Sequence, residues 1–261
     1  MAEYTQGDER LHMAYSFELL TDDFSAAYIR QTVEELEASI GDGWPCWAIG
    51  NHDVQRVATR WGKGESNPDL VKMLNGMLFS LRGSVCSYQG EELGLTEAPI
   101  EFEQLQDPFG IAFWPMFKGR DGCRTPMPWF KDAVQAGFSK VAPWLPIPLA
   151  HAEKAVDVQE SMPESTLNSY RRFLAWRKQQ PILISGDIHF VDANDAILAF
   201  ERQLAEQKML VLFNFSDQNT SFNCDEYQLS AELNEHGLLA GKLVGNTIEL
   251  PPFGCYFANI K

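Results

Sequence analysis

The sequence predicts an α/β fold in which a few parallel βα units precede an all-β module. Two observations lead to this prediction. Over residues 11–88, short apolar runs alternate with helical patterns at intervals of roughly 35 residues, which is typical of βα units in a parallel sheet. After about residue 186, short apolar runs separated by turn residues follow one another without helices, which favours an antiparallel module of about 80 residues.

Three short strands are expected in the first part of the chain, at residues 11–17, 46–50 and 84–88. Each is an apolar or alternating run bounded by turn residues. A closed barrel has eight βα units and takes about 250 residues. The three predicted strands give only three such units in this chain.

Helical periodicity connects these strands. Apolar residues recur at helical spacing over residues 29–40, behind Ser25 as N-cap. A second helix begins with Asn67 as N-cap and Pro68 at its first position, the arrangement that satisfies exposed N–H groups best. A third helix is expected over residues 165–179.

A long region at about residues 95–163 is rich in Pro, Trp and Phe and shows no regular pattern. Connections of this length usually carry function. We therefore divide the chain into residues 1–181, which contain the βα units with this insertion, and residues 182–261, the all-β domain. The predicted strands of the second domain are residues 188–191, 196–203, 208–215, 220–223, 247–250 and 253–258.

Composition excludes several classes of function. The formal charge of −15 argues against nucleic acid and anionic membrane surfaces as partners, since both need a basic face. The first twenty residues contain no signal-peptide core and no apolar run reaches the length of a membrane span, so we expect a cytoplasmic protein. Its odd number of widely spaced cysteines indicates buried, reduced thiols. They are Cys46, Cys86, Cys123, Cys224 and Cys255.

Polar side chains end the predicted strand over residues 46–50. Asn51, His52 and Asp53 follow its apolar run directly, where a parallel sheet or barrel binds its ligands. The residues alone leave two interpretations open, an Asn-Asp turn at a strand end or a functional site.

A metal-dependent hydrolase that uses His52 and Asp53 is a weaker alternative. Adjacent strand residues point to opposite faces, and no further histidine or carboxylate sits at ligand spacing. We therefore assign no metal ligand.

Four stretches of the chain carry motifs that can be compared with known families. Residues 50–53 read G-N-H-D and are followed by Arg56, residues 83–92 read G-S-V-C-S-Y-Q-G-E-E, residues 119–129 read G-R-D-G-C-R-T-P-M-P-W, and residues 251–254 read P-P-F-G. In this order they resemble the seventh-strand motif, the eighth-strand motif, the R-D-x-x-R-T-P-M-x-W stretch and the last strand of α-glucosidases. The chain is thus similar to the oligo-1,6-glucosidase branch of the alpha-amylase family of glycoside hydrolases.

The resemblance implies roles for three residues. Asp53 matches the third catalytic carboxylate, which stabilises the transition state by accepting hydrogen bonds from sugar hydroxyls. Such contacts strengthen as the ring flattens towards an oxocarbenium ion. His52 matches a donor to the same sugar, and Arg120 matches an arginine that contacts both the aspartate and the glucose. For Arg120 the alternative on the residues alone is a salt bridge within the loop.

Other charged residues of these motifs are interpreted as structural. Arg56 and Arg124 are expected to form ion pairs, and Glu91 and Glu92 to hold the loop after the third predicted strand.

The two carboxyl groups that perform the covalent chemistry are not found. A retaining glycosidase needs a nucleophile and an acid/base about 5–5.5 Å apart. In the family the nucleophile lies in G-x-R-x-D-x-x-x-H, and no such pattern occurs in this sequence. The resemblance therefore implies the C-terminal half of a retaining α-glucosidase: the last three βα units of a (β/α)8 TIM barrel followed by an antiparallel β-sandwich. We expect this fragment not to hydrolyse α-glucosides alone.

Partners and alternatives follow from this incomplete barrel. Three parallel strands expose edges that a closed barrel abolishes, so we expect self-association or pairing with the missing N-terminal half. The substrate class implied is small α-glucoside oligosaccharides, without a cofactor; calcium occurs in some relatives, and no ligand set for it is seen. A non-catalytic carbohydrate-binding or interaction module of the same fold is the alternative. Linkage, chain length and the choice between hydrolysis and glucosyl transfer stay open.

Overall fold

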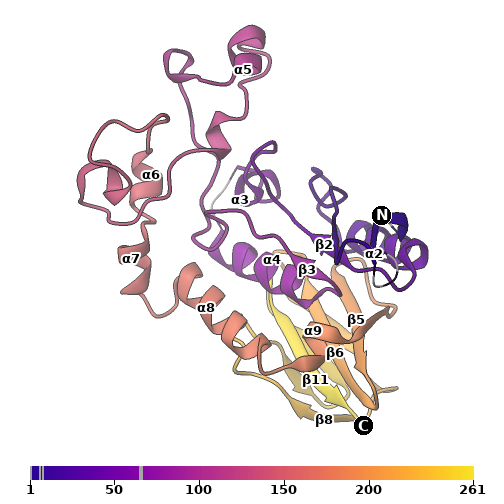
Figure 1. The fold of residues 1–261 in the computed structure, drawn as a ribbon. Coiled ribbons are helices and arrows are strands. Elements are labelled where there is room, and N and C mark those ends of the chain that lie inside the picture. The colour runs from indigo at the N-terminus through magenta and orange to yellow at the C-terminus, as the bar shows by residue number, and fades with distance from the viewer. Residues whose placement is uncertain (1, 6, 8, 65–66) are drawn as a thin grey trace. The chain divides into compact units, whose positions relative to one another are not determined.

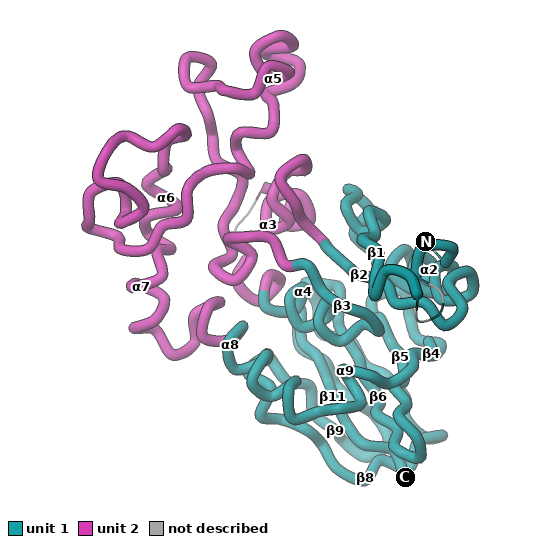
Figure 2. Tube along the Cα trace, in the orientation of Figure 1, with its two compact units in different colours: residues 1–48, 72–86, 170–261 teal, residues 49–71, 87–169 magenta. Residues whose placement is uncertain are grey.

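The computed structural model describes residues 2–5, 7, 9–64 and 67–261 (Figure 1). It forms two compact units, which Figure 2 shows in different colours. Unit 1 contains residues 1–48, 72–86 and 170–261, and unit 2 contains residues 49–71 and 87–169.

Three parallel strands lie in unit 1. They are β1 (Ala14–Tyr15), β2 (Pro45–Trp47) and β3 (Ser84–Val85), in the order β1-β2-β3. The predicted parallel pairing is confirmed, but each strand is shorter than its apolar pattern. Ala48 shows why, because it is fully buried and yet lies outside the ladder. An apolar sequence pattern predicts which residues are buried, and the buried segment is longer than the segment whose hydrogen bonds define the strand.

The helices begin where their capping residues predict. Helix α2 (Ala26–Ile40) follows Ser25, whose hydroxyl accepts a backbone N–H of the first turn. Helix α4 (Pro68–Ser80) follows Asn67, whose side-chain oxygen accepts the N–H groups of the second and third residues after it. Helix α8 (Thr166–Arg177) is the third predicted helix. In the described part of unit 1, two short helices were not predicted, α1 (Ala2–Thr5) and α9 (Pro181–Ser185).

The C-terminal strands form two antiparallel sheets, one of five strands in the order β4-β5-β6-β11-β8 and one of three in the order β7-β10-β9. Buried side chains of both sheets, among them Leu212 and Ile248, form one core. Strands β8 and β9 were not predicted, because their side chains are mostly exposed and carry no apolar alternation. The strands are β4 (Asp187–Phe190), β5 (Ile197–Leu204), β6 (Gln207–Asn214), β7 (Thr220–Asn223), β8 (Leu229–Glu232), β9 (Lys242–Val244), β10 (Thr247–Leu250) and β11 (Cys255–Ile260).

A buried arginine ties the ends of two helices to β5 within unit 1. Arg202 donates to the carbonyl oxygens of Ser80 (2.6 Å), Leu183 (3.2 Å), Gly186 (2.6 Å) and Asp187 (3.1 Å). Burial lowers the pKa of the guanidinium to about 9. Carbonyls at helix ends lack intrahelical partners, so this side chain satisfies groups that would otherwise be buried without donors.

Unit 2 contains the long insertion, which is built from short helices rather than from irregular chain alone. Small apolar clusters hold it, one around Leu93, Leu95 and Leu167 and another around Ala98 and Ile100. No helix exceeds six residues within the insertion, so no helical period was visible in the sequence. The helices of unit 2 are α3 (Val57–Arg60), α5 (Pro108–Phe113), α6 (Leu149–Ala152), α7 (Val156–Glu160) and 3₁₀ turns at Phe102–Gln104, Asp121–Cys123 and Val134–Gly137.

Two sequence expectations concern the surface. All five cysteines are free as predicted, but Cys86 is exposed and not buried. In the described part of the chain, no helix is long and apolar enough to cross a bilayer.

Candidate functional site

A side-chain turn presents the polar residues that follow β2. Asn51 accepts hydrogen bonds at Oδ1 from the backbone N–H groups of Asp53 (2.8 Å) and Val54 (3.1 Å). Asparagine stabilises such turns because its side chain imitates a backbone carbonyl. The turn and the site are therefore not alternatives, since the turn itself places Asp53.

His52 and Asp53 lie close together and are open to solvent. The distance from His52 Nε2 to Asp53 Oδ2 is 3.4 Å, and the two side chains are 66% and 47% exposed. The expectation that these neighbours point to opposite faces was wrong, because they lie in a bend beyond the end of the strand. An exposed carboxylate beside an imidazole can accept a hydrogen bond from one hydroxyl while the imidazole donates a hydrogen bond to a second hydroxyl.

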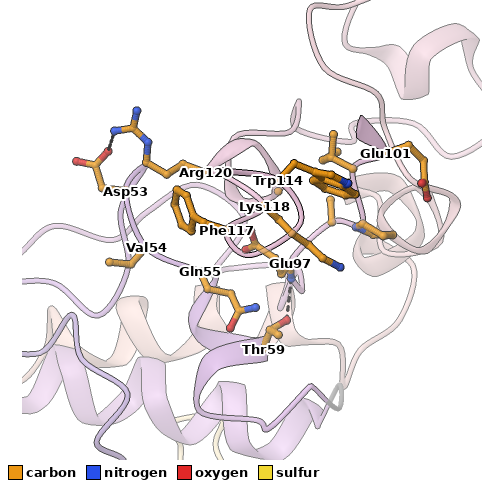
Figure 3. Close-up of a pocket in the computed structure, with 15 residues that line it drawn as sticks. Asp53, Val54, Gln55, Thr59, Glu97, Glu101, Trp114, Phe117, Lys118 and Arg120 are labelled. Atoms are coloured by element: carbon orange, nitrogen blue, oxygen red, sulfur yellow. Dashed lines mark hydrogen bonds and ion pairs between the residues drawn. The ribbon is translucent and has the colours of Figure 1, made fainter. Parts of the chain in front are cut away.

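Two arginines of the insertion converge on Asp53. Arg120 Nη1 donates to Asp53 Oδ1 at 2.9 Å, as Figure 3 shows, and Arg124 Nη2 donates to the same oxygen at 3.2 Å. Arg124 Nε also donates to the carbonyl of His52 at 2.8 Å. The structure thus brings together the three residues predicted for the site. Arg124 forms an ion pair, as expected, but its partner is the site carboxylate itself.

Asp107, which the sequence did not single out, holds Arg120 from the other side. Its carboxylate is fully buried and accepts Arg120 Nε at 2.9 Å, Nη2 at 3.0 Å and the backbone N–H of Arg120 at 2.9 Å. The hydrogen bonds from Arg120 hold the pKa of this carboxyl well below its usual range. The one sequence signal was Asp107 before Pro108, which is typical of an N-cap, and Asp107 does cap α5 through the N–H of Phe109.

Asp121 fixes the backbone that carries Asp107. Its Oδ2 accepts the N–H groups of Gln106 (2.6 Å) and Asp107 (2.8 Å), and the residue is fully buried. Asp121 thus holds the backbone of Asp107, and Asp107 in turn holds Arg120.

Arg56 ties the segment after the Asp53 turn to Gln89, Glu97 and Thr125. Its backbone N–H donates to Glu97 Oε2 at 2.8 Å, and its side chain donates to the carbonyl of Gln89 at 2.7 Å and to the Thr125 hydroxyl at 3.4 Å. The side chain is buried, which lowers the pKa of its guanidinium. The buried contacts agree with a structural role for Arg56, but among the described residues its side chain binds a carbonyl and a hydroxyl, and the expected ion pair is not formed.

Glu91 and Glu92 hold the loop after β3, as expected. Glu91 Oε2 accepts the Ser87 hydroxyl at 2.9 Å and the N–H of Tyr88 at 3.0 Å, and Glu92 accepts the N–H of Gly90 at 2.8 Å. Burial raises the pKa of Glu91 to about 8.

His151 fixes the stretch that carries Arg124, and sequence reasoning missed it. Its Nε2 lies 2.8 Å from the carbonyl of Thr96, and its Nδ1 lies 3.2 Å from the Thr125 hydroxyl. A carbonyl can only accept, so Nε2 carries the hydrogen and Nδ1 accepts from the hydroxyl. Burial lowers the pKa of His151 to about 4, which keeps this neutral arrangement.

A cavity of about 650 Å³ extends from the Asp53–Arg120 pair along the insertion (Figure 3). Its wall combines polar groups with the aromatic rings of Trp114 and Phe117 and the ammonium of Lys118. Hydroxyl-binding groups beside apolar rings suit a molecule with both polar edges and apolar faces, as sugars have. Over residues 2–5, 7, 9–64 and 67–261, no group of three or more His, Cys, Asp or Glu side chains is placed to hold a metal ion.

Comparisons with known proteins indicate the family of the chain. The family model described as "Alpha amylase, catalytic domain" matches residues 1–186, and that described as "Maltogenic Amylase, C-terminal domain" matches residues 188–257. The chain is 44% identical over 260 residues to "Probable alpha-glucosidase" of Rhizobium meliloti, a match that covers 99% of this chain and 47% of that protein. It is 28% identical over 257 residues to "Oligo-1,6-glucosidase" of Parageobacillus thermoglucosidasius, which covers 86% of this chain and 46% of that protein.

A solved structure matches over the same length. The crystal structure of an alpha-glucosyl transfer enzyme, XgtA, aligns with a TM-score of 0.95 at 49% identity and covers 100% of this chain and 48% of that one. The chain thus spans about half the length of the relatives it matches.

Proposed function

The chain belongs to the alpha-amylase family, whose fold is a TIM barrel followed by an antiparallel β-sheet domain, and we propose that it supplies the glucose-binding part of a retaining α-glucosidase. The substrates that we propose are small α-linked glucose oligosaccharides. The names of the two relatives and the resemblance of residues 50–53 and 119–129 to the family motifs support this class.

The observation that carries the proposal is the set of contacts around Asp53. Two guanidinium groups that stay charged at any physiological pH meet one carboxylate, which remains half-exposed beside His52. Such a group can accept sugar hydroxyls while the arginines hold it in place. Contacts of this kind contribute several kcal/mol when they strengthen in an oxocarbenium-like transition state.

We propose further that the nucleophile and the acid/base come from residues outside this sequence. The 261 residues contain no G-x-R-x-D-x-x-x-H pattern, and the parallel sheet of the described residues has three strands where a TIM barrel has eight. A second polypeptide segment, or a second copy of the chain, would supply further strands. The chain alone should then bind glucosides without cleaving them.

Glucosyl transfer is the second candidate. The high identity to an alpha-glucosyl transfer enzyme favours it, and the same contacts around Asp53 would serve both reactions. The two differ in whether water or a sugar hydroxyl accepts the glucosyl group.

Two measurements test the proposal. A chromogenic α-glucoside should not be hydrolysed by the purified chain, whereas methyl α-D-glucoside should bind saturably in a saturation-transfer NMR experiment. Asp53→Asn should remove this binding, and Asp132→Asn, which changes an exposed aspartate of the same unit, should not. Turnover that Asp53→Asn abolishes would disprove the absence of catalysis, and binding that survives Asp53→Asn would disprove the site.

A further inference from the structure

Arg120 is bound much more extensively by Asp107 than by Asp53. Its Nε, its Nη2 and its backbone N–H all donate to Asp107, whereas only Nη1 donates to Asp53. The Asp107 side chain is fully buried and that of Asp53 is 47% exposed. Charge-assisted bonds are stronger away from water and two parallel bonds also fix direction, so Asp107 is the stronger partner.

The carboxylate of Asp107 has no capacity left for another ligand. Oδ2 accepts two N–H groups of Arg120, and Oδ1 accepts one from Arg120 and one from the backbone of Phe109. A carboxylate offers about four acceptor sites, and all four are used here. Asp107 therefore cannot bind substrate itself and acts only through Arg120.

The surroundings prevent the guanidinium from turning. The ring of Phe109 lies 5.8 Å from Arg120 Cζ and covers one face of the guanidinium. Asp121 fixes the backbone N–H groups of Gln106 and Asp107, so the carboxylate cannot follow a moving arginine. The bonds described use three of the five N–H groups of the guanidinium, and its Nη1 edge faces Asp53.

We infer that Asp107 is the positioning residue of this site: its buried carboxylate locks the Arg120 guanidinium so that only the Nη1 edge is presented to Asp53 and to a sugar. The presentation of this edge to a sugar rests on the proposed function. The fixed orientation of Arg120 does not, because it is a property of the chain without a ligand. A locked arginine loses no side-chain freedom when a sugar binds, so the affinity does not carry that entropic cost.

The lock can be measured on the full chain labelled with ¹⁵N-arginine. The Nε–H signal of Arg120, assigned by its loss in Arg120→Lys, should exchange with solvent at least about tenfold more slowly than that of Arg30, which is about equally exposed but donates from Nε to the half-exposed Glu34 and not to a buried carboxylate. Asp53→Asn should keep this slow exchange, because the Nε–H bonds to Asp107. Asp107→Asn should abolish the slow exchange, because the NH₂ group of the asparagine would face N–H groups, which are also donors.

A matched control separates the lock from general loosening of unit 2. Asp157→Asn changes another aspartate that accepts backbone N–H groups, those of Lys131 and Val158, and it should leave Arg120 exchange unchanged. Loss of protection in Asp53→Asn, or its survival in Asp107→Asn, would overturn the inference. The Asp53→Asn result decides the matter even where Asp107→Asn fails to fold.

The sugar-dependent part has its own readout. Asp107→Asn should weaken the binding of methyl α-D-glucoside at least about tenfold, and unchanged affinity in a variant with fast Arg120 exchange would overturn the link to the sugar. A wild-type chain that binds no glucoside but keeps Arg120 exchange slow through Asp107 would disprove the proposed function and leave the lock standing.

Discussion

Two arginines, one in each unit, are held in opposite ways. Arg202 in unit 1 is fully buried and donates to backbone carbonyls, three at the ends of helices and one at the start of β4. Arg120 in unit 2 donates to two carboxylates, one fully buried and one half-exposed. The first arrangement closes every edge of the guanidinium, and the second leaves an edge towards solvent. The type of partner and the exposure of that partner, rather than the residue type, therefore distinguish a structural arginine from an arginine of the candidate site.

The largest effect is expected where the closed arrangement is broken. Arg202→Leu removes the donor for three buried carbonyls and one part-buried carbonyl and should lower the free energy of unfolding by about 3–5 kcal/mol, measured by denaturant titration. Lys208→Leu, on the neighbouring strand β6 but exposed, should change it by less than about 0.5 kcal/mol. Equal effects of the two variants would contradict the assigned role of Arg202.

The two units each contain a buried histidine whose pKa is lowered to about 4, His151 in unit 2 and His236 in unit 1. Burial is the main cause in both, so the unfolded chain binds protons first as the pH falls below the ordinary value of 6.5. Stability is therefore fully present above that pH and lost towards pH 4. Each histidine should contribute a loss of about 2 kcal/mol between pH 7 and pH 5.

Substitution by glutamine tests these two histidines separately. His151→Gln and His236→Gln should each flatten the decrease of stability between pH 7 and pH 5, measured by denaturant titration at both pH values. Glu91→Gln should have the opposite effect and steepen that decrease. Because the pKa of Glu91 is raised to about 8 in the folded chain, its contribution to stability is lost as the pH rises, and the variant lacks this contribution. An unchanged pH dependence in either histidine variant would show that the residue titrates normally.

Arg120→Lys tests the role of the partly exposed arginine in glucoside binding. Lysine lacks the planar fork that two parallel bonds to Asp107 require, so glucoside binding should weaken at least about tenfold. Arg202→Lys should leave binding unchanged while lowering stability. Titration calorimetry with methyl α-D-glucoside measures the first effect, and loss of binding in Arg202→Lys would contradict the separation of roles.

The smallest effect is expected for the second arginine on Asp53. Arg124 makes one bond of 3.2 Å to that carboxylate, and lysine can keep such a single contact. Arg124→Lys should therefore weaken glucoside binding only about two- to fivefold in the same titration. A loss as large as that in Arg120→Lys would show that the two arginines act equally.

The sequence predicted what depends on neighbouring residues. Asn67 and Pro68 marked the start of α4, and the motifs at residues 50–53 and 119–129 marked the two segments that meet at the candidate site. It did not predict the partner of Arg120, because Asp107 lies 13 residues away and looks like an ordinary N-cap. It did not indicate His151 either, since a single histidine in an aperiodic region carries no pattern. Contacts made across loops depend on the folded chain and leave little trace in local spacing.

One measurement tests directly whether the Nη1 edge of Arg120 is available to a sugar. Methyl α-D-glucoside should be titrated into the ¹⁵N-arginine-labelled chain while the guanidinium signals of Arg120 and Arg202 are followed together. We predict a saturable shift of the Arg120 signals, which Asp53→Asn abolishes, and no shift of the Arg202 signals. Arg120 signals that do not move, or that move only as much as those of Arg202, would contradict the account.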